Sequence, residues 1–319
     1  MKPMIRIIIT YSFLFCFLVS SPVFCGNFSE SASFQKGIKT GTIVNEKLSE
    51  ISGIFSSRRN SGVLFVLNDS GNLPEIYAVS HGGTLLKTFP VAGIKNRDWE
   101  DMSGYRHRGN DFLIIGDMGD NKAVRAFCTL YAVKEPEVTA SMATAPLEVT
   151  WRMRFRYADG PRDCEALAVD EPNQKIYLLS KRETYPTLYE LPLSFTPEDR
   201  MYTATPVAKI RTIPQPTPAD LKEKYGKYRS QPTSMDIYAD GTALMILTYK
   251  NGYLFRRGPN QTWAEVFKST PETISLPLPN TGELIQREAL CVDHDTKSII
   301  VTTEQLPAPI YTLMPQNIP

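Results

Sequence analysis

Short, strongly apolar runs recur along the chain, and charged or turn-forming residues bound each of them. Five such runs contain four or five residues each, at 63–67, 112–115, 175–179, 243–247 and 298–301. Runs of this length are typical of buried β-strands, because helices need about ten or more residues. A further strand centred on an aromatic residue follows each run, at Tyr77, Tyr131, Tyr189, Tyr253 and Tyr311. The pattern predicts an all-β fold.

The apolar runs belong to a longer unit that occurs five times. Each unit opens with a short strand that carries an acidic or hydroxyl residue, and these markers are Glu50, Glu100, Glu165, Ser234 and Glu288. The markers are about 50 to 70 residues apart, which suits four-stranded propeller blades with added loops. The added loops are expected at 136–145 and in the Pro-rich stretch at 214–227.

Only three strands follow the last marker, so the fifth unit lacks its outer strand. The segment at 41–44 precedes the first marker and is expected to supply that strand. Such closure leaves only short sheet edges, which is how radial all-β folds avoid exposed strands. The sequence therefore predicts a five-bladed β-propeller closed by an N-terminal strand. A six-bladed propeller and a β-sandwich with similar strands are the alternatives.

The N-terminus has the pattern of a secretory signal peptide. Lys2 and Arg6 precede an uncharged apolar run at 7–19, and small or turn-forming residues follow at 20–22. The run is shorter than the roughly 20 apolar residues of a membrane-spanning helix, although an uncleaved N-terminal anchor is an alternative. We predict a signal peptide at 1–26 and a single propeller domain at 27–319. The mature chain would be secreted or periplasmic, without stable membrane insertion, and we expect a monomer.

The composition supports neither nucleic-acid binding nor a disulfide-rich scaffold. Lys and Arg number 35 against 34 Asp and Glu, so no basic surface for nucleic acid is indicated. After signal removal the cysteines are Cys128, Cys164 and Cys291, an odd number at wide spacing that matches no zinc motif. We interpret them as small buried apolar side chains, with one disulfide as the alternative.

The first strand of each propeller blade lines the central channel, so the five markers are expected to converge there. The carboxylates of Glu50, Glu100, Glu165 and Glu288, beside the Ser234 hydroxyl, would repel one another unless a cation or protons neutralised them. Ligands that are all oxygen favour a hard cation, Ca²⁺ ahead of Mg²⁺. No histidine lies at a marker, which disfavours a histidine-based triad. The alternative is that each glutamate bonds backbone amides of the next blade or pairs with a basic residue.

A second set of polar residues follows the apolar runs, where strand ends open onto one face of a propeller. Asp69, Asp117 and Asp120 are candidates for holding a catalytic metal or placing a water molecule. Lys181 and Arg182 are candidates for binding an anion. These residues predict a metal-dependent hydrolase of a small anionic or ester substrate, such as a phosphoester. The alternatives are a non-catalytic propeller that binds a glycan, peptide or surface partner and, for 116–121, a plain turn.

Five motifs carry a resemblance to a known group of proteins. They are EISG at 50–53, NDSG at 68–71, DWED at 98–101, GDMGDN at 116–121 and DCEAL at 163–167. Together they resemble a group of uncharacterised exported β-propeller proteins of bacteria. That resemblance implies the fold and the export, and it implies no activity.

The order Glu, Glu, Glu, Ser, Glu at the markers is more distantly similar to the calcium-activated nucleotidase (apyrase) family. Its members are five-bladed propellers with one Ca²⁺ in the channel, and they hydrolyse nucleoside di- and triphosphates. The resemblance implies calcium coordination by Glu100, Glu165, Ser234 and Glu288, with residue 49 or 50 at the first blade. It also puts the pair at 181–182 near a basic pair of the family, whose other phosphate-contacting basic residues are not evident in this chain.

Overall fold

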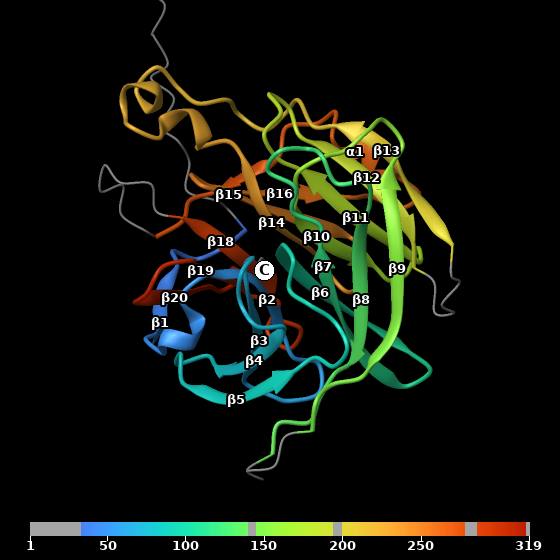
Figure 1. The fold of residues 1–319 in the computed structure, drawn as a ribbon. Helices are drawn as coiled ribbons and strands as arrows, with labels where there is room; N and C mark the ends of the chain where they lie inside the picture. The colour runs from blue at the N-terminus through green and yellow to red at the C-terminus, as the bar shows by residue number, and fades with distance from the viewer. Residues whose placement is uncertain (1–32, 140–144, 194–199, 278–285, 317–319) are drawn as a thin grey trace, which may run out of the picture.

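The computed structural model describes residues 33–139, 145–193, 200–277 and 286–316. The predicted signal peptide at 1–26 lies outside these residues and stays a prediction. The regular structure is almost entirely β, so the all-β prediction is confirmed (Figure 1). Among the described residues, none of the short helices could cross a lipid bilayer.

The sheets are built from strands that follow one another along the chain and pair antiparallel. One sheet contains β2 (Ile51–Ser56), β3 (Val63–Asn68), β4 (Glu75–Ser80) and β5 (Leu85–Pro90). Another contains β14 (Pro232–Ile237), β15 (Ala243–Thr248), β16 (Gly252–Arg256) and β17 (Glu272–Ile274). A third contains β18 (Arg287–Val292), β19 (Ile299–Thr303) and β20 (Ala308–Leu313). The N-terminal strand β1 (Ile38–Ile43) completes this last sheet by pairing with β20.

The remaining sheet has eight strands and consists of two four-stranded meanders. The first contains β6 (Trp99–His107), β7 (Asn110–Asp117), β8 (Cys128–Lys134) and β9 (Val149–Tyr157). The second contains β10 (Cys164–Asp170), β11 (Lys175–Ser180), β12 (Thr187–Pro192) and β13 (Met201–Lys209). The outer strands β9 and β13 pair in parallel and join the two meanders. The helices are η1 (Glu46–Leu48), η2 (Asp220–Lys222), η3 (Gly226–Tyr228) and α1 (Trp263–Val266).

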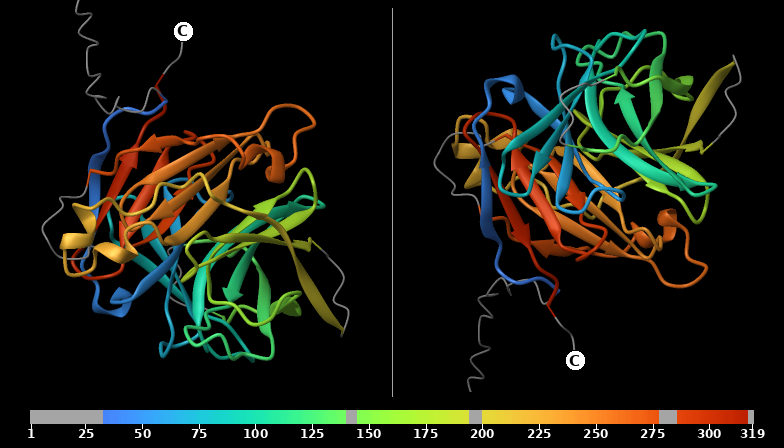
Figure 2. Two further views of the ribbon diagram at one scale, coloured as in Figure 1. Left: turned by 90° about the horizontal axis from the view of Figure 1, so that it is seen from above. Right: turned by 90° about the horizontal axis from the view of Figure 1, so that it is seen from below.

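The first strand of each group lies at the centre of the molecule. The contacts run from β2 to β6, β10, β14, β18 and back to β2, which closes a ring. Figure 1 shows these strands near the middle and β1, β5, β9 and β13 at the periphery, and Figure 2 shows the same sheets from above and below. The second strands β3, β15 and β19 are buried along their whole length. Burial on both faces explains why their sequences are continuous apolar runs.

Buried polar side chains link the strands of the ring. The Asp101 carboxylate in β6 accepts hydrogen bonds from the amide of Leu167 in β10 at 3.0 Å and from the hydroxyl of Ser234 in β14 at 3.1 Å. Asp236 in β14 accepts from the amide of Val292 in β18 at 2.8 Å. Burial raises the pKa of Asp101 well above its usual value, and these hydrogen bonds oppose that shift. Buried hydrogen bonds therefore connect neighbouring strands of the ring through its interior.

Cys128, Cys164 and Cys291 are buried free thiols. Cys128 and Cys164 pack in one hydrophobic cluster, and Cys291 packs in another beside β2 and β19. Their placement fits the interpretation as small apolar side chains, because burial raises the pKa of each thiol and so disfavours the reactive thiolate.

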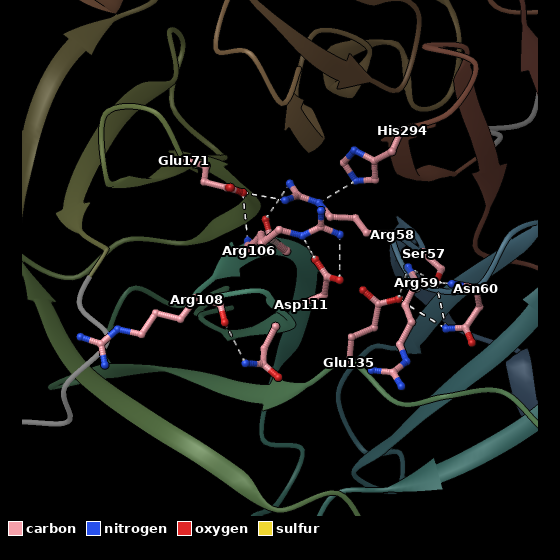
Figure 3. A network of polar contacts seen from close by, with 12 residues as sticks. Ser57, Arg58, Arg59, Asn60, Arg106, Arg108, Asp111, Glu135, Glu171 and His294 are labelled. Atoms are coloured by element: carbon pink, nitrogen blue, oxygen red, sulfur yellow. Dashed lines mark hydrogen bonds and ion pairs between the residues drawn. The ribbon is translucent and has the colours of Figure 1, made fainter.

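Arg58 lies at the end of the ring where the central strands finish (Figure 3). Its Nη1 atom is 2.6 Å from Oε2 of Glu171, which follows β10. Its Nε atom donates to Nε2 of His294, which follows β18, at 3.2 Å. Its Nη2 atom donates to the carbonyl of Gly104 in β6 at 3.5 Å. One guanidinium, with a side chain only 13% exposed, thus joins segments from four groups of strands.

We predict that His294 makes the stability depend on pH. Burial, and secondarily Arg58, lowers the pKa of His294 from 6.5 to about 4. Below about pH 6.5 the unfolded chain binds a proton that the folded chain rejects, so the free energy of unfolding falls as the pH drops towards 4. The expected loss is about 2 to 3 kcal/mol between about pH 7 and pH 4.5, measured by urea denaturation. His294→Gln keeps an acceptor for Arg58 without titrating, so equal pH dependence in both proteins would contradict the prediction.

Candidate metal centre

A cavity of about 120 Å³ opens at the end of the ring where the central strands begin. Among the described residues, five carboxyl side chains line it, and these are Asp69, Glu100, Glu165, Glu288 and Glu304. Two basic side chains, Lys181 and Arg182, also line it. The acidic groups outnumber the basic ones, so the cavity attracts cations more than anions.

The structure brings three of the five marker residues together in this cavity, namely Glu100, Glu165 and Glu288. The other two lie elsewhere. Glu50 is exposed and accepts a hydrogen bond from the side-chain amide of Asn72 at 2.6 Å. The Ser234 hydroxyl is fully buried and is bonded to Asp101. The markers therefore do not form one ligand shell.

Of the candidate residues that follow the apolar runs, some line the cavity and others do not. Asp69, Lys181 and Arg182 line the cavity, whereas Asp117 and Asp120 do not. Asp117 is paired with the buried guanidinium of Arg125 at 2.7 Å. The Asp120 carboxylate accepts from the backbone amides of residues 124 and 125 at 2.9 and 2.7 Å. Residues 116 and 117 thus belong to β7, and the Asp120 side chain binds the backbone of the segment that follows it.

One side of the cavity carries its own positive charge. The Lys181 ammonium, with a side chain only 4% exposed, lies 2.7 Å from Oε2 of Glu165 and donates to the Tyr249 hydroxyl at 2.9 Å. That hydroxyl donates in turn to Oε1 of Glu288 at 2.8 Å. Burial opposes the charge on Lys181, but Glu165 and Glu288 outweigh it and raise the pKa of Lys181 well above its usual value. Lys181 is therefore a permanent cation.

Arg182 supplies a second cation on this side. Its Nε atom lies 2.6 Å from Oδ2 of Asp163, and its Nη2 atom lies 3.5 Å from Oε1 of Glu165. Asp163 also accepts from the amide of Asp120 at 2.9 Å. Carboxylate oxygens of Glu100, Asp163 and Glu165 lie within 4.8 Å of one another, but Asp163 and Glu165 already have these partners.

Three carboxylates in or beside the cavity have no such ion pair. Asp69, Asp98 and Glu100 each offer an oxygen within 4.8 Å of the others, and no described basic residue forms an ion pair with them. Two oxygens that bind one Ca²⁺ at about 2.4 Å are at most about 5 Å apart, so the spacing suits a single ion. Asp98 and Asp163 were not among the sequence candidates, although each precedes a marker by two residues.

Glu100 is the most unusual member of this set. The residue is only 5% exposed and lines the cavity, yet its carboxylate accepts no hydrogen bond from any described residue. Burial, together with the charges of Glu165, Asp69 and Asp98, raises the pKa of Glu100 well above its usual value. Burial also raises the pKa of Asp69 to about 7. Either protons or a cation must neutralise this cluster.

Local hydrogen bonds bring Asp69 and Asp98 together from different strands. The side-chain amide of Asn96 donates to the carbonyls of Asn68 and Asp69 at 3.0 and 2.8 Å, and its oxygen accepts from the amide of Trp99 at 3.1 Å. This side chain thereby joins the end of β3 to the start of β6. The turns that carry the two carboxylates are held side by side as a result.

Comparisons with known proteins give only distant similarities. No protein-family model and no curated protein matches the chain. A luciferin-regenerating enzyme shares 12% identity over 89% of this chain and 92% of its own, with a TM-score of 0.41. A glucose dehydrogenase shares 10% identity over 87% of this chain and 99% of its own, with a TM-score of 0.44. A complex of KlAtg21 with the coiled-coil of AgAtg16 shares 14% identity over 84% of this chain and 67% of its own, with a TM-score of 0.36. Similarities at this level carry no inference about activity.

Proposed function

We propose that the chain is an exported five-bladed β-propeller that holds a divalent cation, Ca²⁺ ahead of Mg²⁺, at the mouth of its channel. Two features support five blades. The eight-stranded sheet divides at the parallel β9–β13 pair into two antiparallel meanders, which together with the other sheets makes five groups of four strands. The closed ring of contacts passes through one strand of each group, which a sandwich of two stacked sheets would lack.

The cation proposal depends on Glu100. A buried carboxylate without a hydrogen-bond donor is costly, and a metal ion is one of the few groups that removes the cost. Asp69, Asp98 and Glu100 would hold the ion, and water would complete the six to eight oxygen ligands that Ca²⁺ takes. With its ligands all oxygen, the set favours a hard cation over zinc or copper. Export, which depends on the predicted signal peptide, would place the site where calcium is abundant.

The cation serves, in this proposal, in the hydrolysis of a small anionic or ester substrate. A bound divalent ion would supply Lewis acidity and local positive charge in a cavity that is otherwise acidic. Asp69 lines the cavity, and it would orient a water molecule. Arg182 has a side chain that is 42% exposed, so it is the basic group best placed to contact an anionic substrate.

One observation favours a second candidate function. In this alternative the chain is a non-catalytic propeller that binds a glycan, peptide or surface partner. Both basic groups of the cavity are already engaged by carboxylates, Lys181 by Glu165 and Arg182 by Asp163. In that case the cation would only stabilise the channel mouth.

Calcium binding is expected to depend on Glu100. Titration of Ca²⁺ into the EDTA-treated mature chain, followed by calorimetry, should give one site with a dissociation constant of about 10⁻⁶ to 10⁻³ M. Glu100→Gln removes the buried charge and should weaken binding at least about tenfold. Glu50→Gln is the matched control, because it changes an exposed marker outside the cavity and should leave the affinity unaltered. The proposal fails if the wild type binds no Ca²⁺ or if Glu100→Gln binds it equally well.

Gly119 is expected to be required for the geometry of the site. Its amide donates to the carbonyl of Asp98 at 3.2 Å, and a Cβ added to it would lie 2.6 Å from Cγ of Asp98 and in clash with the Glu100 carboxylate. Gly119→Ala should therefore displace both carboxylates and weaken Ca²⁺ binding about tenfold, with little change in the thermal midpoint of the metal-free protein. Gly82→Ala, where the added Cβ is 3.6 Å from its nearest neighbour, is the control. Unchanged affinity in Gly119→Ala would exclude the Asp98 and Glu100 pair as ligands.

The hydrolytic role is expected to appear as calcium-dependent turnover. The mature chain is incubated with nucleotides, simple phosphoesters and lactones, with Ca²⁺ and with EDTA. Release of product that requires Ca²⁺ and is lost in Glu100→Gln supports the hydrolase. Calcium binding without turnover of any substrate class, together with retention on immobilised glycans or peptides, supports the second candidate instead.

A further inference from the structure

One part of the surface presents lysines and apolar side chains that the proposed function does not use. Residues 214–231, the basic lobe, lie between β13 and β14 and contain the short helices η2 and η3. Figure 1 shows these two helices, in gold, outside the ring of sheets. The lobe is tied to the ring by Lys250, which follows β15 and whose ammonium lies 2.7 Å from Oδ2 of Asp220. Tyr249, next to Lys250, lines the cavity, so the lobe is attached at the same end of the ring as the channel mouth.

The acidic and basic side chains of the lobe are used differently. Asp220 has a side chain that is only 8% exposed, and it is paired with Lys250. Glu223 is paired with Arg229, whose own side chain is 6% exposed. The lysines of the lobe, by contrast, are exposed, and none of them forms an ion pair with a described residue; they are Lys222, Lys224 and Lys227. The outward-facing charge of the lobe is therefore positive.

Exposed apolar side chains lie among these lysines. Leu221 is 58% exposed and Tyr225 is 38% exposed. The Lys224 ammonium lies 5.0 Å from the centre of the Tyr225 ring, so cation and ring occupy one patch. A leucine and a tyrosine interspersed with lysines are typical of surfaces that bind the headgroup region of a lipid bilayer, because apolar groups and ammonium groups are both accommodated there.

We propose that the basic lobe binds the surface of an anionic phospholipid bilayer, with its lysines against the phosphates and with Leu221 and Tyr225 among the headgroups. The association is peripheral, and it is independent of the proposed cation site. Each lysine near a negatively charged bilayer strengthens binding about fivefold, so three together favour an anionic over a neutral bilayer by about a hundredfold. A soluble acidic polymer would be attracted to the lysines as well, but it would not bury the exposed leucine. The apolar side chains therefore favour the bilayer.

The test is cosedimentation of the mature chain with lipid vesicles in the presence of EDTA, which removes any contribution of calcium. One set of vesicles contains phosphatidylcholine alone, and the other contains equal parts of phosphatidylcholine and phosphatidylglycerol. Binding is expected to the anionic vesicles only. It should be lost in about 1 M NaCl, because charges are then screened within about 3 Å.

Two triple variants with the same net charge test the place of the contact. The lobe variant combines Lys222→Gln, Lys224→Gln and Lys227→Gln. The matched control changes exposed lysines outside the lobe and combines Lys39→Gln, Lys134→Gln and Lys268→Gln. The lobe variant should bind anionic vesicles about a hundredfold more weakly than the wild type, and the control should bind almost as well. All of these side chains are exposed, so both variants should keep the thermal midpoint of the wild type.

Leu221→Ser distinguishes a bilayer from a soluble acidic polymer. This variant keeps every charge and removes the most exposed apolar side chain of the lobe. It should weaken binding to anionic vesicles about fivefold, because the leucine is no longer transferred from water into the headgroup region. Its binding to dextran sulfate, a soluble polyanion, should equal that of the wild type.

The outcomes are separate from those for the cation site. The proposal is overturned if the wild type does not bind anionic vesicles or if the two triple variants lose binding equally. Binding to dextran sulfate without binding to vesicles also overturns it and indicates an acidic polymer as the partner. Vesicle binding that is unchanged in Leu221→Ser overturns the choice of a bilayer. Absence of calcium binding in the wild type, with vesicle binding retained, overturns the proposed cation site and supports the independence of the lobe.

Discussion

The buried carboxylate of Asp101 is the contact on which the ring of central strands depends. It takes hydrogen bonds from donors in β10 and β14, while the residue itself belongs to β6. Burying a carboxyl group is unfavourable unless its oxygens are satisfied, and the assembled ring supplies these donors. The same contact uses the Ser234 hydroxyl, which keeps that marker out of the cavity. A structural requirement has thus removed one of the expected metal ligands.

The distribution of charge around the cavity follows from a similar competition. Lys181 and Arg182 belong to one short segment after β11, and both turn towards carboxylates of neighbouring strands. Arg182 has a φ of 70°, in the left-handed region that non-glycine residues adopt at a cost of about 1 kcal/mol or more. The guanidinium of this residue forms the ion pair with Asp163. As a result Glu165 and Asp163 are paired with basic side chains, whereas their neighbour Glu100 is not.

The fold was largely predictable, because its signals are local. Apolar runs such as 63–67 correspond to strands buried on both faces, and the strand expected at 41–44 is found as β1, one edge of the last sheet. The candidate site was predictable only in part. Glu100, Glu165 and Glu288 were found from their place in the repeat, whereas Asp98 and Asp163 were missed although they precede two of these markers by two residues. Because alternate residues of an extended chain face the same side, that spacing was a usable signal.

The amino-acid pattern was sufficient for the all-β class and for the residues that begin each central strand, since burial and turn formation act over a few neighbouring residues. It did not predict the parallel β9–β13 pair that joins two groups of strands into one sheet. Which partner each carboxylate has could be learned only from the folded structure. Lys181 meets Tyr249 across 68 positions of sequence, and Ser234 meets Asp101 across 133. Such contacts depend on the directions in which side chains leave strands of different sheets. Which acidic groups are satisfied, and which are left for a cation, is therefore decided by the three-dimensional arrangement.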